Sequence, residues 1–305
     1  MRNQFDYRRL GDTARRIAWL GAALAGMAIW PCRADDTNPA AQGTAPTLCP
    51  VADYFENWFD RVTAIQNEQP HWVTPLVTVT PRLEEELRYD QYWESVPHGR
   101  SLDIYGAGKG LELIPGRPIE VILGVPAYET ESTTPTKSGW ADENLLLKYR
   151  ILSANEQNGN YILTAFFGMS IPTGGKNFSS GHYTYTPTLA GGKGWGNFDF
   201  QSTLGVTLPD NLGVRKGAGT PVLSNTALQY RVEKYFWPEV EANYTYWPNG
   251  EHEGLNQLFL TPGLLIGRLP IYHRVGVTFG AGCEFAVTDK PLVWNNFILT
   301  ARIPF

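Results

Sequence analysis

The stretch that decides the fold is the last ten residues, Asn296-Phe297-Ile298-Leu299-Thr300-Ala301-Arg302-Ile303-Pro304-Phe305. All of its odd positions are apolar, whereas even positions carry Asn296, Thr300 and Arg302. A period of two predicts a β-strand with one apolar face. Because chain ends usually fray, a strand that runs to a terminal aromatic residue is typical of a bacterial outer-membrane β-barrel, whose last strand closes the barrel. A soluble β-domain with an apolar tail is the alternative, since alternation is a weak signal in any one strand.

The first 34 residues have the pattern of a secretion signal. A basic region precedes the uncharged stretch from Ile17 to Trp30, and Cys32-Arg33-Ala34 fits a cleavage site before Asp35. The uncharged stretch is shorter than the roughly 20 residues of a membrane-spanning helix. We therefore expect residues 1–34 to be a cleaved signal peptide, with export through the general secretory route to the cell outer membrane.

Composition narrows the possible partners. The whole chain has 25 basic and 30 acidic residues, and removal of the leader leaves 19 basic against 28 acidic ones. This acidity argues against a nucleic-acid partner, whose phosphates require a basic surface. The 31 glycines, 10 tryptophans and 15 tyrosines suit strand bends and the aromatic girdles of a membrane barrel. Lipid of the outer membrane is the partner that this composition favours.

The chain divides into three regions. After the leader, residues 35–72 are expected to be a flexible segment, because their first part is rich in Pro, Thr and Ala. A short helix is possible within it, since Tyr54, Phe55, Trp58, Phe59 and Val62 are spaced as on one helical face. Residues 73–305 are expected to form strands and turns throughout, and thus the barrel.

Turn signals set the number of strands. Short connections alternate with longer polar loops, as in barrels with short periplasmic turns and long external loops. Counting back from a final strand that ends at the periplasm gives an all-β, antiparallel up-and-down barrel of twelve strands. A barrel of ten strands is the alternative, if the first or the sixth predicted strand does not form. The short turns are placed at 115–118, 153–159, 194–196, 234–238 and 269–270, and the loops at 95–99, 129–139, 174–181, 209–219, 248–254 and 288–291.

Alternation also assigns side chains to the lumen. In the first strand, Leu83 and Leu87 share the outward parity, and a charge facing lipid at the bilayer centre costs roughly 2–4 kcal/mol. Charged residues of the other parity should therefore line the lumen, with Arg231 paired to Glu239 or Glu241. The expected lining residues are Glu84, Glu86, Arg88, Asp90, Lys148, Arg150, Arg231, Glu233, Glu239, Glu241, Arg274, Glu284 and Arg302.

Six stretches between residues 75 and 263 share the pattern of a known family: 75–84 (PLVTVTPRLE), 108–115 (GKGLELIP), 146–150 (LLKYR), 192–196 (GKGWG), 234–239 (KYFWPE) and 260–263 (LTPG). On these stretches, the region from about residue 75 to the end resembles a bacterial outer-membrane family, the MetA-pathway of phenol degradation family, whose members are often called transporters. The resemblance implies passage of small solutes, aromatic ones among them. A closed barrel with a structural or binding role and a hydrolase at the barrel rim remain alternatives, although no catalytic set, metal site or cofactor motif is expected.

Phe305 is expected to be the assembly signal that the barrel-assembly machinery reads. Deleting Phe305, or replacing it with a charged residue, should impair assembly, because the final strand would lose its recognition and its terminal apolar contact with lipid. Cell fractionation should then show less heat-modifiable protein in the outer membrane. Normal assembly of both variants would count against the membrane-barrel interpretation.

Overall fold

The computed structural model describes residues 50–106, 110–210 and 217–305. The expected signal peptide and the first part of the expected flexible segment lie outside the described residues. The chain falls into two units, residues 1–59 and 60–305. In the first, the helix α2 (Pro50–Glu56) brings the rings of Tyr54 and Phe55 into edge-on contact. The helix α3 (Trp58–Gln66) continues into the second unit, where Val62 and Ile65 are buried.

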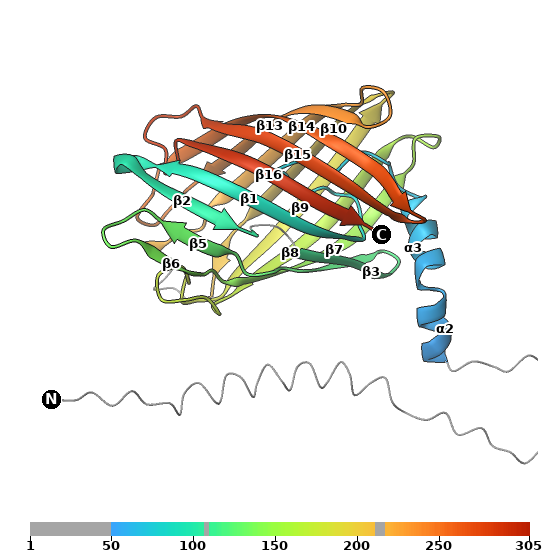
Figure 1. Ribbon diagram of the computed structural model, residues 1–305, viewed down its shortest axis with the longest axis horizontal. Coiled ribbons are helices and arrows are strands. Elements are labelled where there is room, and N and C mark those ends of the chain that lie inside the picture. Colours follow the sequence, from blue (N-terminus) through green and yellow to red (C-terminus); the bar gives the residue numbers. More distant parts are fainter. Residues whose placement is uncertain (1–49, 107–109, 211–216) are drawn as a thin grey trace, which may run out of the picture. The chain divides into compact units, whose positions relative to one another are not determined.

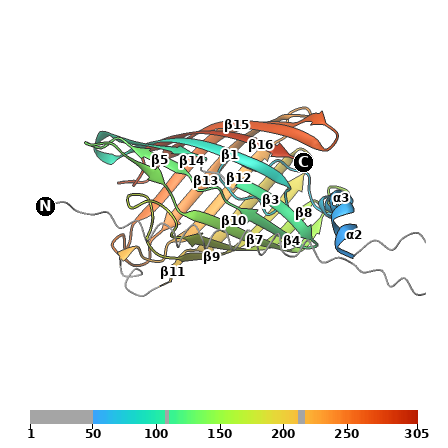
Figure 2. The same ribbon diagram turned by 60° about the horizontal axis from the view of Figure 1, so that its bottom comes forward.

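The second unit is a closed antiparallel β-barrel (Figures 1 and 2). The barrel closes where β16 pairs with β1, in a register that runs from Glu86↔Pro304 to Ser95↔Asn295. A short 3-10 helix, η1 (Pro97–Gly99), joins the first two strands. The strands are β1 (Glu86–Val96), β2 (Arg100–Tyr105), β3 (Gly110–Gly116), β4 (Ile119–Leu123), β5 (Tyr128–Glu131), β6 (Lys137–Trp140), β7 (Glu143–Ala154), β8 (Tyr161–Ile171), β9 (Thr184–Trp195), β10 (Phe198–Val206), β11 (Leu208–Pro209), β12 (Val222–Tyr230), β13 (Phe236–Tyr246), β14 (Asn256–Tyr272), β15 (Val275–Ala286) and β16 (Asn295–Pro304).

These sixteen segments make the twelve strands that the turn pattern predicted. Four wall strands are each built from two segments, because β1 pairs with both β2 and β3, β3 pairs with β4, and β2 pairs with β5. In the same way β6 and β7 form one wall strand, and β10 and β11 both pair with β9. The expected barrel of about twelve strands is confirmed.

Two boundaries differ from the sequence prediction. The first strand begins at Glu86 rather than near Val73, because the preceding residues fold into the lumen. The turn expected at residues 269–270 lies at His273 and Arg274, and β14 runs on to Tyr272. Two register shifts against β15 accommodate Pro270 at the end of this long strand. Irregular pairing is where a sheet tolerates proline.

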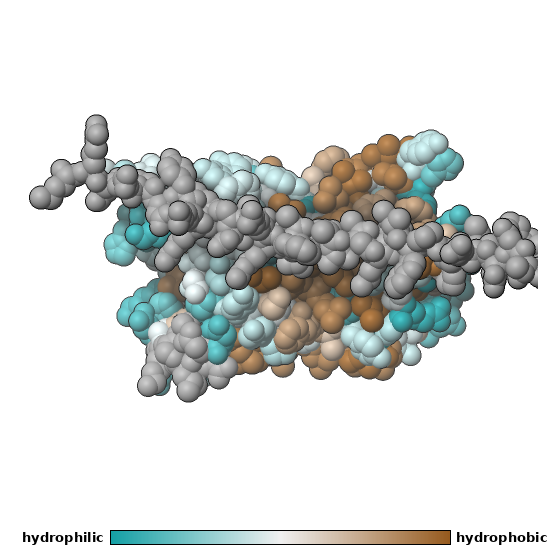
Figure 3. Space-filling view, turned by 90° about the horizontal axis from the view of Figure 1, so that it is seen from below, coloured by the Kyte–Doolittle hydropathy of each residue, from teal (hydrophilic) through white to brown (hydrophobic). Residues whose placement is uncertain are grey.

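Side chains of the wall alternate between an exposed apolar face and a buried polar face. In β1, Leu87 and Tyr89 are about half exposed, whereas Arg88 and Asp90 between them are almost fully buried. On the face in Figure 3, hydrophobic residues gather over the central part of the wall, and hydrophilic residues lie toward both ends. Within the described residues, no helix is long and apolar enough to cross a membrane.

The direction in which a wall side chain points determines how much a charged substitution destabilises the folded protein. Leu189 of β9 points outward and is 51% exposed, whereas Thr186 of the same strand lines a cavity inside the barrel. Leu189→Arg should destabilise the folded protein in lipid vesicles by about 2–4 kcal/mol, and Thr186→Arg by much less. Urea titration of tryptophan fluorescence in vesicles measures both. Equal destabilisation by the two variants would contradict the assigned facing or the membrane location.

Candidate functional site: the barrel lumen

The lumen contains a segment of the chain itself. Residues 69–85, here called the plug, precede β1 and contain no strand. Leu76, Thr78, Thr80 and Leu83 of the plug are fully buried. Backbone N–H and C=O groups that are buried without a partner are costly. The plug has no strand ladder to satisfy them, so side chains of the wall must do so.

Two carboxylates of β13 accept hydrogen bonds from the plug backbone. Glu239 accepts from the amide of Leu76 at 3.0 Å. Glu241 accepts from the amides of Val77 at 2.7 Å and Thr78 at 2.6 Å. Both carboxylates are buried, and hydrogen bonds of this charge-assisted kind are stronger than those between neutral groups. These residues therefore hold the plug and do not form an open ring of negative charge around a channel.

Basic side chains of other strands bind the plug's carbonyl groups. The guanidinium of Arg88 donates to the carbonyl of Leu76 at 2.6 Å and forms a 2.8 Å ion pair with Asp90. The guanidinium of Arg302 on β16 donates to the carbonyls of Thr74 and Pro75. The stretch 74–78 is thus fixed from both sides, with its amides on β13 and its carbonyls on the closing strands.

A glycine-lined socket receives the side chain of Leu76. A Cβ atom added at Gly263, Gly280 or Gly282 would lie 2.4 to 2.8 Å from a methyl carbon of Leu76. Leu76 packs there with Trp237 and Leu265, and the leucine is fully buried. These glycines leave the room that lets an apolar side chain of the plug reach the backbone of the wall.

The side chain of Gln69, at the start of the plug, bonds to the backbone of Leu83 as a neighbouring strand would. The side-chain amide of Gln69 donates to the carbonyl of Leu83 at 2.7 Å, and its oxygen accepts from the amide of Leu83 at 2.9 Å. Arg82 forms a 2.7 Å ion pair with Glu84. The expectation that Leu83 faces outward is therefore wrong: the residue precedes β1 and lies within the plug.

A buried charge cluster lies beside the plug. The ammonium of Lys148 contacts the Glu120 carboxylate at 2.8 Å and the Glu112 carboxylate at 4.0 Å, and it donates to the carbonyl of Arg82 at 3.0 Å. Glu120 also accepts from the amide of Glu84 at 2.5 Å. All three charged side chains are fully buried. Removing Lys148 would leave two adjacent buried carboxylates without a cation, which is more damaging than losing a surface pair.

The start of the plug is held by a contact between His71 and Glu156 of a short turn. His71 donates its backbone N–H to Glu156 at 2.6 Å, and its ring Nδ1 lies 2.9 Å from the same carboxylate. Burial raises the pKa of Glu156, but the hydrogen bonds from His71 outweigh it and hold the pKa below its usual range. The contact therefore contributes stability above the ordinary carboxyl pKa, and this contribution is lost as the pH falls through the lowered value.

Cavities remain on both sides of the plug. Toward the long loops, one of about 330 Å³ is bounded by Val77 and Val79 of the plug, by Arg88 and Asp90, and by both apolar and polar wall residues. A neighbouring space of about 140 Å³ shares Val79 with it. Toward the short turns, a third cavity of about 340 Å³, here called the vestibule, is bounded by Arg302 and other charged and aromatic residues. The plug separates the first cavity from the vestibule.

The structure places the expected lining residues in two groups. Most are buried within the barrel, including Glu84, which belongs to the plug and not to a strand. The turns at the short-turn end hold the remaining three, Arg231, Glu233 and Arg274, of which Glu233 is exposed. The buried ones are Glu84, Glu86, Arg88, Asp90, Lys148, Arg150, Glu239, Glu241, Glu284 and Arg302.

The expected pairing of Arg231 is wrong. Its guanidinium donates to Asn197 at 3.3 Å and lies 5.7 Å from the ring centre of Trp237, while Glu239 and Glu241 bind the plug. Sequence reasoning also missed inward polar residues of several strands. Alternation within their own strands could have found them: Glu112, Glu120, Thr164, Asp199 and Gln201. Among the described residues, no cluster of His, Cys, Asp and Glu could hold a metal ion.

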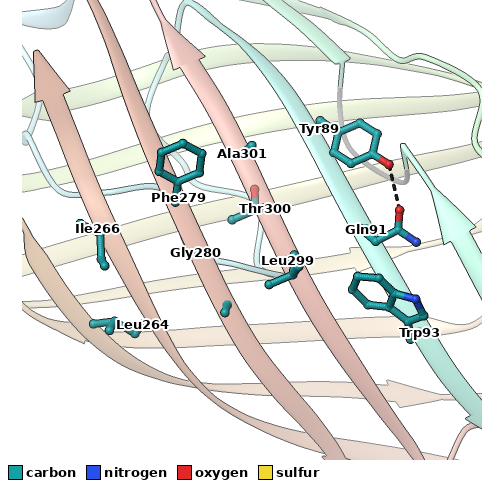
Figure 4. A pocket seen from close by; sticks show the side chains of 11 residues that line it. Tyr89, Gln91, Trp93, Leu264, Ile266, Phe279, Gly280, Leu299, Thr300 and Ala301 are labelled. Carbon is teal, nitrogen blue, oxygen red and sulfur yellow. Dashed lines mark hydrogen bonds between the residues drawn. The ribbon is translucent and has the colours of Figure 1, made fainter. Parts of the chain in front are cut away.

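A large apolar groove lies on the outer face of the wall, across β1, β16, β15 and β14 (Figure 4). It encloses about 550 Å³, because the small residues Ala281 and Ala301 are surrounded by Trp93, Phe279 and other large side chains. The hydroxyl of Tyr89 donates to Gln91 at 2.8 Å within it. The groove is on the face that would contact lipid, so it is not part of the lumen.

No family profile and no curated protein matches this chain. The COG4313 outer membrane channel from Pseudomonas putida F1 is similar in fold, with a TM-score of 0.51 and 12% identity over 72% of this chain and 94% of that one. This likeness shows the fold alone.

Two further barrels give lower scores. The translocator domain of the autotransporter NalP from Neisseria meningitidis has a TM-score of 0.43 and 10% identity, over 72% of this chain and 87% of that one. Salmonella typhi OmpF, in a complex with daunomycin, has a TM-score of 0.34 and 8% identity, over 72% and 96%.

The contacts of the plug lead to a direct test. Glu241→Gln keeps one acceptor but presents an amide to one of two backbone donors, so the plug should be held less firmly. Hydrogen–deuterium exchange of the amides of residues 76–80 should become at least about tenfold faster, the equivalent of ~1.4 kcal/mol. Glu284→Gln is the matched control, because that buried carboxylate accepts from Asn296 and not from the plug. Equal exchange in both variants would contradict the assigned role of Glu241.

Proposed function

We propose that this protein is an outer-membrane channel for small solutes, and that the plug closes its lumen in the state described here. The apolar outer face of the closed barrel supports a place in a membrane, and the terminal strand and the likeness to an outer membrane channel agree with it. The resemblance to the MetA-pathway of phenol degradation family points the same way.

The observation that carries the proposal is the pair of cavities on either side of the plug. The stretch 74–78 of the plug is held by hydrogen bonds to Arg88, Arg302, Glu239 and Glu241, and its later part is held by Lys148, which donates to the carbonyl of Arg82. A purely structural barrel has no need of open space on both sides of a plug. Displacing these residues would join the first cavity to the vestibule and complete a path through the lumen.

The first cavity indicates the kind of solute. It combines apolar side chains such as Ile122 and Leu146 with Tyr92 and the Arg88–Asp90 pair. Its 330 Å³ lies at the lower end of the range for pockets that bind small organic molecules, about 300–1,000 Å³. A small, partly apolar molecule, including one with an aromatic ring, would fit this combination.

A closed barrel with a structural or binding role is the rival function. The observation that favours it is the number of charge-assisted bonds on the plug, since Glu241 alone accepts from two amides. If every bond persists at equilibrium, the lumen stays closed. The two functions therefore differ in whether the plug moves.

Conductance measurements separate these functions. Refolded wild-type protein in planar bilayers should show brief openings, and Leu76→Ala should raise the open fraction at least several-fold. Truncating Leu76 leaves the glycine-lined socket empty, and such a substitution of a buried leucine weakens the packing of the plug against the wall by about 2–5 kcal/mol. Ile298→Ala is the control, because it removes a fully buried apolar side chain of the wall that is not part of the Leu76 cluster. Absence of current from wild type and from Leu76→Ala would favour the closed barrel.

A further inference from the structure

The vestibule has an excess of positive charge in a protein that is acidic overall. Five basic residues line it, against two acidic ones, Glu84 and Glu86. Two of the basic residues are already used: Arg82 is paired with Glu84, and Arg302 is bonded to plug carbonyls. The other three are Arg231, which donates to Asn197 at 3.3 Å, Arg268, which donates to the carbonyl of Arg274 at 2.6 Å, and Lys234. In the described part of the chain, no ion pair joins any of these three to a carboxylate.

The fold brings these three cations to one place at the mouth. Arg231 and Lys234 flank the tight turn between β12 and β13, and Arg268 lies on the adjoining strand β14. A backbone hydrogen bond of 2.9 Å between Gly267 and Tyr235 holds the two elements together. Lys234 and Arg268 are exposed, and Arg231 is partly exposed. Their charged groups are therefore accessible to a solute in the vestibule.

Aromatic side chains lie beside the cations. The guanidinium of Arg231 lies 5.7 Å from the ring centre of Trp237, and the ammonium of Lys234 lies 5.1 Å from that of Tyr235. Trp72 of the plug completes the aromatic part of the wall. A surface that joins unpaired cations to aromatic faces is complementary to an anionic group attached to an apolar ring.

We propose that the vestibule is a binding site for a small organic carboxylate with a ring-sized apolar body. The cations Arg231, Lys234 and Arg268 would bind the carboxylate, and Trp72, Tyr235 and Trp237 would contact the ring. Its volume of about 340 Å³ accommodates a molecule of that size. The proposal rests on the proposed channel function for the route by which such a solute arrives, but binding itself needs no open channel.

Isothermal titration calorimetry on the folded full-length protein in neutral detergent tests the site, with benzoate as the probe. Benzoate should bind saturably, and benzamide, its neutral isostere, at least about tenfold more weakly, because it lacks the charge that the cations bind. The triple variant Arg231→Gln/Lys234→Gln/Arg268→Gln should lose at least about tenfold in benzoate affinity. Arg231→Lys/Arg268→Lys keeps the charge and should lose less.

The charge-matched control removes three cations at the opposite end of the barrel, Arg100→Gln/Lys137→Gln/Lys290→Gln, and should leave benzoate binding unchanged. Heat-modifiable migration shows whether each variant is folded. Equal affinity for benzoate and benzamide, no saturable benzoate binding to wild type, or undiminished binding by a folded triple variant at the vestibule would overturn the proposal. Benzoate binding without any conductance would sustain this site and reject the channel.

Discussion

A chain segment enclosed in a barrel must find partners for its backbone polar groups, and the structure of the lumen depends on this constraint. The plug has no strand ladder, so its amides bond to carboxylates of β13 and its carbonyls to guanidiniums of β1 and β16. The buried charged side chains of the wall are in turn stabilised by the plug, because burying a charge without a partner carries a large free-energy penalty. Plug and wall therefore satisfy one another, and neither is stable in this arrangement without the other.

The same reciprocity explains the small residues of the last strands. Gly263, Gly280 and Gly282 leave room on the inner face for Leu76, so the wall is thinnest where the plug presses against it. Arg302 fixes the plug from β16, the strand whose pairing with β1 closes the barrel. Barrel closure and lumen closure thus share one strand, and a change in that strand should affect both.

Sequence alternation predicted a barrel with a polar inner face, because a period of two follows directly from strand geometry. The alternation of short and long turns predicted its twelve strands. It could not predict the plug. Leu83 and Glu84 continue the alternation of β1 backward by chance, yet the chain turns inward before Glu86, since Gln69 and Glu241 supply bonds from distant parts of the sequence. The roles of Glu239 and Glu241 as plug anchors likewise depend on contacts across more than 160 residues.

The proposed channel requires the plug to move when a solute passes. A reversible cross-link tests it most directly: Thr78→Cys on the plug and Asn243→Cys on the wall, whose native side chains are 3.3 Å apart, in a background with Cys49→Ser and Cys283→Ser. Single-channel recording should show no openings in the oxidised protein, and openings should return on reduction in the same bilayer. Equal current in the oxidised and reduced states would contradict a channel that the plug closes.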